Sequence, residues 1–227
     1  MLELRHISAS GFKAVDRFSI TVEPSLTLLV GMNGAGKSSV LQLFALVRDL
    51  AEGKPSRFFE ERGWDRTELR FRSPNNRSTI VRVSAVFGSE LWGEVRWRIR
   101  WGLKSGRLQS ELVQMRSTPS SEWLDLMTFD HKRGGRAGRQ ELPALKFEGS
   151  LLSAVQAESG SEEVDRVLAE LYFWLTHIQS LELLSPAAMK GGTRLSANDM
   201  GSRGDRLAGF LAALRPKQRS RVVRRVN

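Results

Sequence analysis

The sequence predicts an α/β fold in which a strand, a glycine-rich loop and a helix form a core beside an antiparallel β-meander and a few further helices. Three observations predict this fold. A glycine-rich stretch at residues 31–39 lies between a strand-like run and a helical pattern. Apolar and polar residues alternate along residues 78–116, as in successive antiparallel strands. Apolar residues recur at helical spacing over residues 159–175.

The glycine-rich stretch reads GMNGAGKSS and fits the pattern G-x-x-x-x-G-K-[ST] of a phosphate-binding loop. The apolar run 26–30 leads into it and predicts a buried strand, and a helix is expected from Ser38 onward. Glycines let successive backbone N–H groups face one anion, and the helix N-terminus adds its positive end. The residues expected to bind the nucleotide are Gly31, Asn33, Gly34, Ala35, Gly36, Lys37, Ser38 and Ser39.

Two side chains of this stretch have expected roles in phosphate chemistry. Lys37 is expected to place its ammonium on the β- and γ-phosphates of ATP, as the catalytic cation of the site. The Ser38 hydroxyl is expected to ligate Mg²⁺. The pattern therefore predicts a bound nucleotide with Mg²⁺, and the weaker alternative is a glycine turn that starts a helix by chance.

Composition restricts the class of protein. The 227 residues include 35 lysines and arginines against 25 acidic residues, and the net charge of +10 favours a polyanionic partner, usually nucleic acid, over a solubility surface. There is no cysteine, and the three histidines are widely separated, without metal-ligand spacing. No apolar run approaches the roughly 20 residues of a transmembrane helix, and the N-terminus does not resemble a secretory signal. We therefore expect a cytoplasmic protein without membrane contact.

The first fifty residues resemble a known class of ATPase. Strand patterns at residues 2–7 and 18–22 flank a Gly-Phe-Lys turn, and the loop after them has the form G-x-N-G-x-G-K-S-S. This order resembles the ATP-binding head of the SMC/RecF-type ABC ATPases. The resemblance implies a P-loop NTPase core with an adjoining antiparallel sheet, ATP and Mg²⁺ as ligands, and a homodimer or higher oligomer formed through the ATP site. It also implies that Phe12 and Lys13 lie near the ATP, although a solvated turn lysine is an equal interpretation of Lys13.

The meander and the segment before it combine basic and aromatic residues. Along residues 95–101 the alternation puts Val95, Trp97, Ile99 and Trp101 on one side and Arg96, Arg98 and Arg100 on the other. The arginine side is either a solvated face, which is slightly favoured, or a phosphate-contacting stripe. Residues 53–76 predict a loop excursion with one short helix, whose aromatic residues are better explained by packing than by base stacking. The basic stretch 131–139 is expected to be a mobile hairpin tip or loop that could touch a nucleic-acid backbone.

The C-terminal third predicts helices and a strand. Ser159 and Glu162 fit a capping box at the start of a helix that ends at residue 175. Its expected core face contains Val164, Val167, Leu168, Leu171 and Leu175. Residues 178–184 predict a strand and residues 185–194 a loop, and residues 204–214 predict a helix before a basic tail. The resemblance to ABC-type heads implies that the loop couples the γ-phosphate to a helical lobe. This part more loosely resembles bacterial AAA-type ATPases related to the OLD family.

The motifs that complete ATP hydrolysis in this class are missing from the sequence. No Asp-Glu dipeptide occurs, and the nearest match to the serine-glycine signature, residues 195–199, lacks the paired glycines. We therefore expect residues 1–227 to be the N-terminal part of a single ABC-type head, with the remainder of the head absent. Its parts are the strand pair, loop and first helix (1–52), the meander (78–116), and the helices with the coupling loop (159–227). ATPase activity is expected of the full-length protein and not of this segment alone.

Two functions are consistent with these patterns. The first is an ATPase head that dimerises around ATP·Mg and drives or gates a nucleic-acid transaction such as DNA repair or anti-phage defence. The alternative is an ATP-sensing regulatory module that holds a partner effector, for example a nuclease, without itself contacting nucleic acid. An ABC transporter subunit is a weaker third hypothesis, because such subunits usually contain less arginine and a glutamine-ended strand soon after the first helix.

Overall fold

The computed structural model describes residues 1–70, 79–155, 159–180, 189, 200–201, 204–216 and 218. The chain divides into two compact units, Met1–Ile178 and Gln179–Asn227. Within the described residues, no helix combines the length and the hydropathy that a membrane crossing requires.

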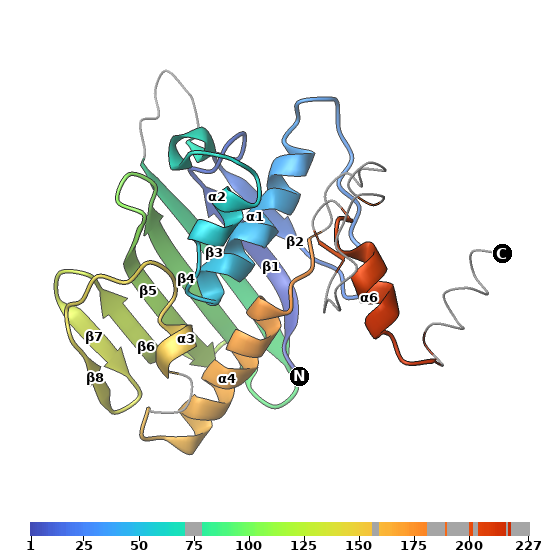
Figure 1. Cartoon of the computed structure of the whole chain (residues 1–227). Helices are drawn as coiled ribbons and strands as arrows, with labels where there is room; N and C mark the ends of the chain where they lie inside the picture. Colours follow the sequence, from blue (N-terminus) through green and yellow to red (C-terminus); the bar gives the residue numbers. More distant parts are fainter. Residues whose placement is uncertain are drawn as a thin grey trace. The chain divides into compact units, whose positions relative to one another are not determined.

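A single antiparallel sheet of eight strands forms the framework of the first unit (Figure 1). In spatial order its strands are β2 (Phe18–Thr21), β1 (Glu3–Ser10), β3 (Ile80–Ser89), β4 (Gly93–Gly102), β5 (Arg107–Arg116), β6 (Leu124–Asp130), β7 (Gly134–Ala137) and β8 (Gln140–Leu142). From β3 onward, neighbours in the sheet are also neighbours in the chain, as expected for a meander. The N-terminal strand pair joins the same sheet, because Ile7 of β1 lies opposite Ala85 of β3. The predicted mixed α/β fold with an antiparallel sheet and a few helices is confirmed.

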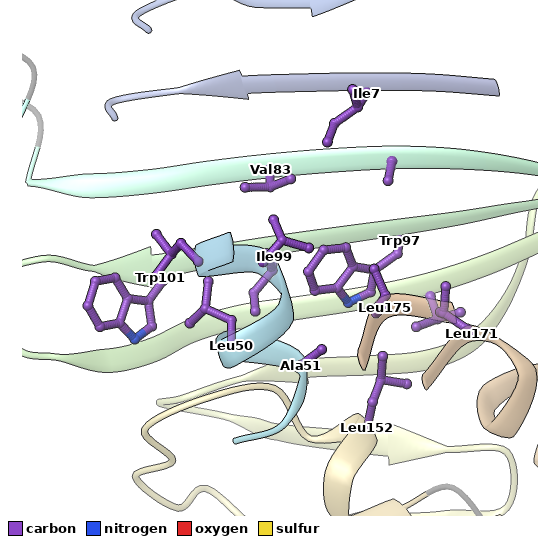
Figure 2. Packing of buried hydrophobic residues seen from close by; sticks show 14 of the residues in the cluster. Ile7, Leu50, Ala51, Val83, Trp97, Ile99, Trp101, Leu152, Leu171 and Leu175 are labelled. Atoms are coloured by element: carbon purple, nitrogen blue, oxygen red, sulfur yellow. The ribbon is translucent and has the colours of Figure 1, made fainter. Parts of the chain in front are cut away.

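The helices of the first unit cover one face of this sheet (Figure 1). They are α1 (Lys37–Ala51), α2 (Ser56–Glu60), α3 (Leu152–Val155) and α4 (Glu162–Thr176), with a short 3-10 helix at Arg66–Leu69. Helix α4 packs against both α1 and α3. Figure 2 shows Leu50 of α1 together with Leu171 and Leu175 of α4 beside the tryptophans of β4. The described part of the second unit contains helix α6 (Leu207–Ala213), which lies inside the helix predicted at 204–214.

The alternation predicted for β4 is confirmed. Its apolar residues Val95, Trp97, Ile99 and Trp101 are all buried in the core, whereas Arg98 and Arg100 on the other face are exposed. The buried indoles also use their N–H groups. Trp97 donates to Glu111 Oε1 at 2.7 Å and Trp101 donates to the backbone oxygen of Glu148 at 2.8 Å. Both tryptophans therefore connect the sheet to polar acceptors while filling the core.

Glu111 of β5 is an acidic residue buried in the core. Its carboxylate also accepts hydrogen bonds from the Ser150 hydroxyl at 2.5 Å and the Leu151 amide at 2.7 Å. Complete burial raises the pKa of Glu111, and the hydrogen bonds from Ser150, Trp97 and Leu151 offset only part of that shift. The carboxyl group thus ties the sheet to the chain that leads into α3.

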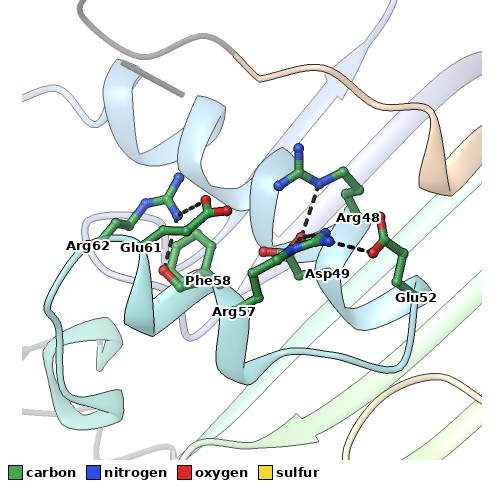
Figure 3. A network of polar contacts seen from close by, with 7 residues as sticks. All are labelled: Arg48, Asp49, Glu52, Arg57, Phe58, Glu61 and Arg62. Atoms are coloured by element: carbon green, nitrogen blue, oxygen red, sulfur yellow. Dashed lines mark hydrogen bonds and ion pairs between the residues drawn. The ribbon is translucent and has the colours of Figure 1, made fainter. Parts of the chain in front are cut away.

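A polar network joins the end of α1 to α2 (Figure 3). Asp49 is fully buried and accepts hydrogen bonds from Arg48 Nε at 3.0 Å and Arg57 Nε at 3.1 Å. Arg57 also forms an ion pair with Glu52 at 2.7 Å. Burial opposes the charge on Arg57, but the hydrogen bonds to Glu52 and Asp49 outweigh it and raise the pKa. The network fixes the angle at which the chain leaves α1.

The aromatic residues after α1 pack as predicted. Phe58 is fully buried, with ring centroids 6.4 Å from Phe12, 5.3 Å from Phe59 and 6.0 Å from Trp64. The Arg62 guanidinium lies 4.1 Å from the Phe58 ring centroid and donates to the Phe58 backbone oxygen at 3.0 Å. This cluster holds α2 against the turn between β1 and β2, so the predicted packing of the aromatic residues is confirmed. The described part of the excursion contains two short helical segments, α2 and the 3-10 helix, rather than the one short helix predicted.

The buried strand predicted at residues 26–30 is not formed. These residues have no regular structure, and Leu26, Leu28 and Val30 are 69%, 76% and 90% exposed. An apolar run becomes a buried strand only where neighbouring strands and covered faces receive it. In the described sheet the edge position beside β1 is taken by β2, and no described strand pairs with residues 26–30.

Two further local predictions are corrected. Helix α4 begins at Glu162 rather than at Ser159, and Ser161 is its N-cap without a side-chain cap. Ser159 is buried and its amide donates to Asp165 Oδ1 at 2.8 Å, so a capping box with Glu162 is wrong. The basic stretch 131–139 is not a simple loop, because its central residues form β7 between two turns.

Several predictions fall on residues that the structure does not describe. Of the expected strand at 178–184, residues 178–180 are irregular and the others lie outside the described residues. The coupling loop at 185–194, apart from Met189, and the signature-like residues 195–199 also lie outside them.

Candidate nucleotide-binding site

The glycine-rich loop ends where α1 begins, as the motif requires. Lys37 is the first residue of α1, and Gly36 is its N-cap with φ of 89°. Gly34 also has a positive φ, of 84°. These values lie in the left-handed region that side chains other than glycine rarely adopt, so the loop's path depends on both glycines. The sequence therefore folds locally into a tight turn that directs the helix N-terminus toward the loop.

The Lys37 ammonium lies over the loop. Its Nζ donates to the backbone oxygens of Gly31 at 2.7 Å and Met32 at 2.9 Å. A backbone hydrogen bond from the Ala35 amide to the Met32 oxygen, at 3.2 Å, closes the same turn. An ammonium has three N–H donors. A phosphate oxygen accepts hydrogen bonds from it more strongly than an exposed carbonyl oxygen does. Lys37 is thus oriented toward the loop by contacts that a phosphate group can replace.

The first turn of α1 supplies further donors. The first N–H groups of a helix have no partner within the helix, and no side chain caps this end of α1. The backbone bond from Val40 to Gly36 starts the helical ladder, which leaves the preceding amides facing the loop. Ser38 is exposed and Ser39 is half-buried. Amides, one ammonium and two hydroxyls fit the chemistry of a triphosphate with its metal ion.

A pocket of about 500 Å³ adjoins this loop. It is bounded by the turn after β1, the start of β2, residues 28–30 and the first turn of α1. Ala14 and Gly36 approach closely, since a Cβ built on Gly36 would lie 3.5 Å from the Cβ of Ala14. Asp16 and Arg17 also line the pocket. No group of three or more metal-ligating side chains occurs within the described part of the chain, so a metal here would depend on serine hydroxyls and phosphate oxygens.

The turn at residues 11–15 lies beside the loop, and its two candidate residues behave differently. Phe12 is completely buried and packs against Phe58, so its side chain has no surface to offer a ligand. Lys13 has φ of 47°, donates to Gln42 Oε1 at 3.0 Å, and lies 3.3 Å from the ring centroid of Trp64. The structure therefore connects Lys13 to α1 and to the aromatic cluster.

Sequence reasoning missed three residues of this region. Gln42 and Trp64 hold Lys13, and Ala14 packs against Gly36. None of them belongs to a motif, and each acquires its place only through contacts between segments far apart in the chain. The helical spacing of polar residues along α1 places Gln42 off the core face, but it does not indicate which residue Gln42 contacts.

A model of the AAA domain family matches residues 6–126, which is just over half of the chain. The chain belongs to the AAA domain family. The match includes the glycine-rich loop, α1 and the strands up to the start of β6. It confirms, at the level of the family, the resemblance to AAA-type ATPases predicted from the sequence.

Comparison with solved structures and curated proteins adds little to the family match. This AAA domain is similar to the recombination mediator protein RecF, solved with ATPγS in a study of the RecFOR pathway, at a TM-score of 0.34 and 16% sequence identity. The likeness covers 54% of this chain and 28% of the RecF chain. No curated protein matches the chain.

Proposed function

We propose that this AAA domain binds ATP·Mg²⁺ in the loop at residues 31–39 and acts in an ATPase. The observation that carries the proposal is the position of Lys37, whose ammonium lies over a glycine loop at the uncapped start of a 15-residue helix. Membership of the AAA domain family supports nucleotide use in general. The helix dipole and the ammonium both favour a negatively charged group at this place.

Each residue of the motif has a proposed role. Backbone amides between Gly31 and Ser39 would hold the phosphates, the Lys37 ammonium would place positive charge at the β- and γ-phosphates, and the Ser38 hydroxyl would be a ligand of the metal ion. Bound Mg²⁺ would neutralise charge on the phosphate oxygens. Phe12 acts only by holding the turn in place. Lys13, beside that turn, is proposed to contribute charge near the nucleotide.

We further propose that ATP binding gates a nucleic-acid transaction, such as DNA repair or anti-phage defence, through a dimer that closes around the nucleotide. The net charge of +10 supports a polyanionic partner. If two copies come together only when ATP is bound, the binding of nucleic acid by the dimer would depend on ATP. Fluorescence anisotropy of a labelled duplex, with and without ATP·Mg²⁺, measures that dependence directly, and binding that ignores ATP would contradict the gating.

One observation favours a second candidate function. The side chains of Leu26, Leu28, Val30 and Met32 are all strongly exposed. Exposed apolar residues that gather in one segment are typical of a protein-binding surface. The alternative is thus an ATP-sensing module that holds a partner effector such as a nuclease. A stoichiometric partner that co-purifies with the protein, together with no affinity for oligonucleotides, would favour this alternative.

The 227-residue chain should bind ATP·Mg²⁺ and hydrolyse it negligibly. Phosphoryl transfer depends on positioning and on charge stabilisation, and the sequence has no Asp-Glu dipeptide to hold the metal shell and orient the attacking water. Calorimetry measures the binding, and release of inorganic phosphate measures the turnover. Turnover well above background that disappears in Lys37→Ala would contradict the expected inactivity, whereas an absence of binding would contradict the proposed function itself.

A further inference from the structure

The sheet face opposite the helices contains a hollow of about 690 Å³. It extends over β1, β3, β4, β5 and β6, where outward residues line up in rows across the strands. One row consists of Ser8, Ser84, Arg98, Leu112 and Thr128, and the next of Ser10, Arg82, Arg100, Ser110 and Asp130. The described helices of this unit pack on the other face (Figure 1). The lining of the hollow therefore combines arginine and hydroxyl side chains with a larger share of apolar surface.

Like charges face each other in this hollow. Arg82 of β3 lies directly opposite Arg100 of β4, and Arg98 lies two residues along the same strand. Like charges in direct cross-strand register destabilise a sheet. Arg133, in the turn before β7, adds a fourth guanidinium to the lining. An anion placed among these side chains would convert their mutual repulsion into attraction.

Within the described part of the chain, fewer acidic than basic side chains line the hollow. Asp130 lines the hollow, but its Oδ1 accepts the backbone amide of Lys132 at 2.9 Å. Glu111 belongs to the same part of β5, but its carboxylate lies on the helix side, bonded to Trp97 and Ser150. The local charge of the hollow is thus clearly positive.

The row beside the hollow continues the positive charge. Arg96 and Arg98 both donate to Gln114 Oε1, a neutral acceptor, at 3.0 Å and 2.9 Å. Arg96 and Arg116 lie 4.0 Å and 4.5 Å from the ring centroid of Trp123. Partial burial lowers the pKa of Arg96, and the charges of Arg98 and Arg116 add to that effect. Arg116 also donates from its Nε to Glu94 Oε2 at 2.6 Å, so Arg96 and Arg98 supply the positive charge beside the hollow.

The floor of the hollow indicates what kind of anion it fits. Short hydroxyl side chains at Ser8, Ser84 and Thr128 offer donors without blocking close approach, and such groups commonly contact phosphate oxygens. Its aromatic lining residue, Phe129, is only 4% exposed. Single-stranded nucleic acid is generally bound with stacked aromatic rings, so the described floor suits a duplex held by its backbone.

We propose that the arginine-lined hollow, on the sheet face opposite the described helices of the first unit, binds the phosphate backbone of a nucleic-acid duplex without reading its sequence. This inference rests on the proposed nucleic-acid function and assigns it to named residues remote from the glycine-rich loop. The hollow and the helix-covered face are opposite sides of one sheet, so binding at the hollow and at the nucleotide loop can be tested separately.

The test compares two variants that remove the same charge. Arg98→Gln/Arg100→Gln removes two cations from the hollow, and Lys54→Gln/Arg166→Gln removes two exposed cations outside it. Anisotropy of a labelled 20-base-pair duplex is measured over a salt series. We expect about a tenfold or greater loss of affinity and a salt slope reduced by about 2 in the first variant. The control variant should keep most of the wild-type affinity for the duplex.

A third variant checks the result by a different change. Ser84→Glu introduces a carboxylate opposite Arg98, a favourable cross-strand pair that should fold and should block a phosphate. We expect it to lose duplex affinity as well, with melting temperatures of all variants near that of the wild type. Equal affinity of Arg98→Gln/Arg100→Gln and the control, or equally tight wild-type binding of polyglutamate, would overturn the proposal. Wild-type ATP·Mg²⁺ binding without any duplex binding would instead contradict the proposed nucleic-acid function and this inference together.

Discussion

Replacement of Lys37 by alanine should reduce the affinity for ATP·Mg²⁺ by about 100-fold or more. Hydrogen bonds to charged groups contribute roughly 1.5–3 kcal/mol each, and a tenfold change in affinity corresponds to about 1.4 kcal/mol. The Lys37 ammonium is the cation that the structure places over the glycine loop. Isothermal titration calorimetry of the wild type and Lys37→Ala with ATP·Mg²⁺ measures the loss.

The substitution should leave folding unchanged, so a difference in ATP·Mg²⁺ affinity between wild type and Lys37→Ala reports on the binding site itself. The two carbonyl oxygens that Lys37 bonds belong to exposed loop residues and can be hydrated instead. Lys54→Ala is a matched control, because Lys54 is an exposed lysine in the chain between α1 and α2. An unchanged affinity in Lys37→Ala, with wild-type binding intact, would show that the nucleotide binds elsewhere.

Trp97→Ala should cost about 3–5 kcal/mol in the free energy of unfolding, the usual range for loss of a buried tryptophan. Trp97 is completely buried at the centre of the sheet, among residues of α1 and α4 (Figure 2). Its removal leaves a cavity and also takes one donor away from the buried carboxylate of Glu111. The melting temperature should fall by roughly 6–20 °C for a domain of this size.

The free energy of unfolding that Trp97→Ala loses should also depend on pH. The pKa of Glu111 is already raised by burial, and it should rise further when the Trp97 donor is gone. In the folded variant Glu111 then keeps its proton at pH values where the same group in the unfolded chain has lost it. The free energy of unfolding of the variant therefore declines as pH increases above the ordinary glutamate range. Urea unfolding at several pH values measures this decline. The control is Trp92→Ala, since Trp92 is only partly buried and donates to Glu170, and it should lose less at every pH.

The sequence predicts the local elements of this fold well, because their signals are periodic. The alternation along β4 identifies its buried face, and the spacing of Val167, Leu168, Leu171 and Leu175 identifies the core face of α4. The motif at residues 31–39 identifies the start of α1 to within one residue. Such patterns depend on neighbours within a few positions, which a sequence shows directly.

Features that depend on distant partners could not be predicted in this way. The apolar run at 26–30 has the composition of a buried strand, but no described strand receives it. Ser159 has the spacing of a cap, but Asp165 rather than Glu162 bonds its amide. Similarly, the opposition of Arg82 and Arg100 follows from the register between β3 and β4, which turn geometry and packing decide.

At the candidate site, too, local patterns could be predicted from the sequence and contacts between distant segments could not. The motif names the loop, Lys37 and Ser38, but it does not indicate that Lys13 is held by Gln42 and Trp64. It also does not indicate that Phe12 is withdrawn into the core. These contacts arise from the path of the chain after α1, where the polar network around Asp49 sets the direction.

Hydrogen exchange with and without ATP·Mg²⁺ tests the central claim most directly, because it locates the bound nucleotide on the chain. Backbone amides between Gly31 and Val40 should exchange more slowly when ATP·Mg²⁺ is present, since the phosphates would engage the loop and the uncapped first turn of α1. Amides in the centre of β4 should be unaffected. Unchanged exchange over residues 31–40 at saturating ATP·Mg²⁺, in a folded sample, would contradict the claim.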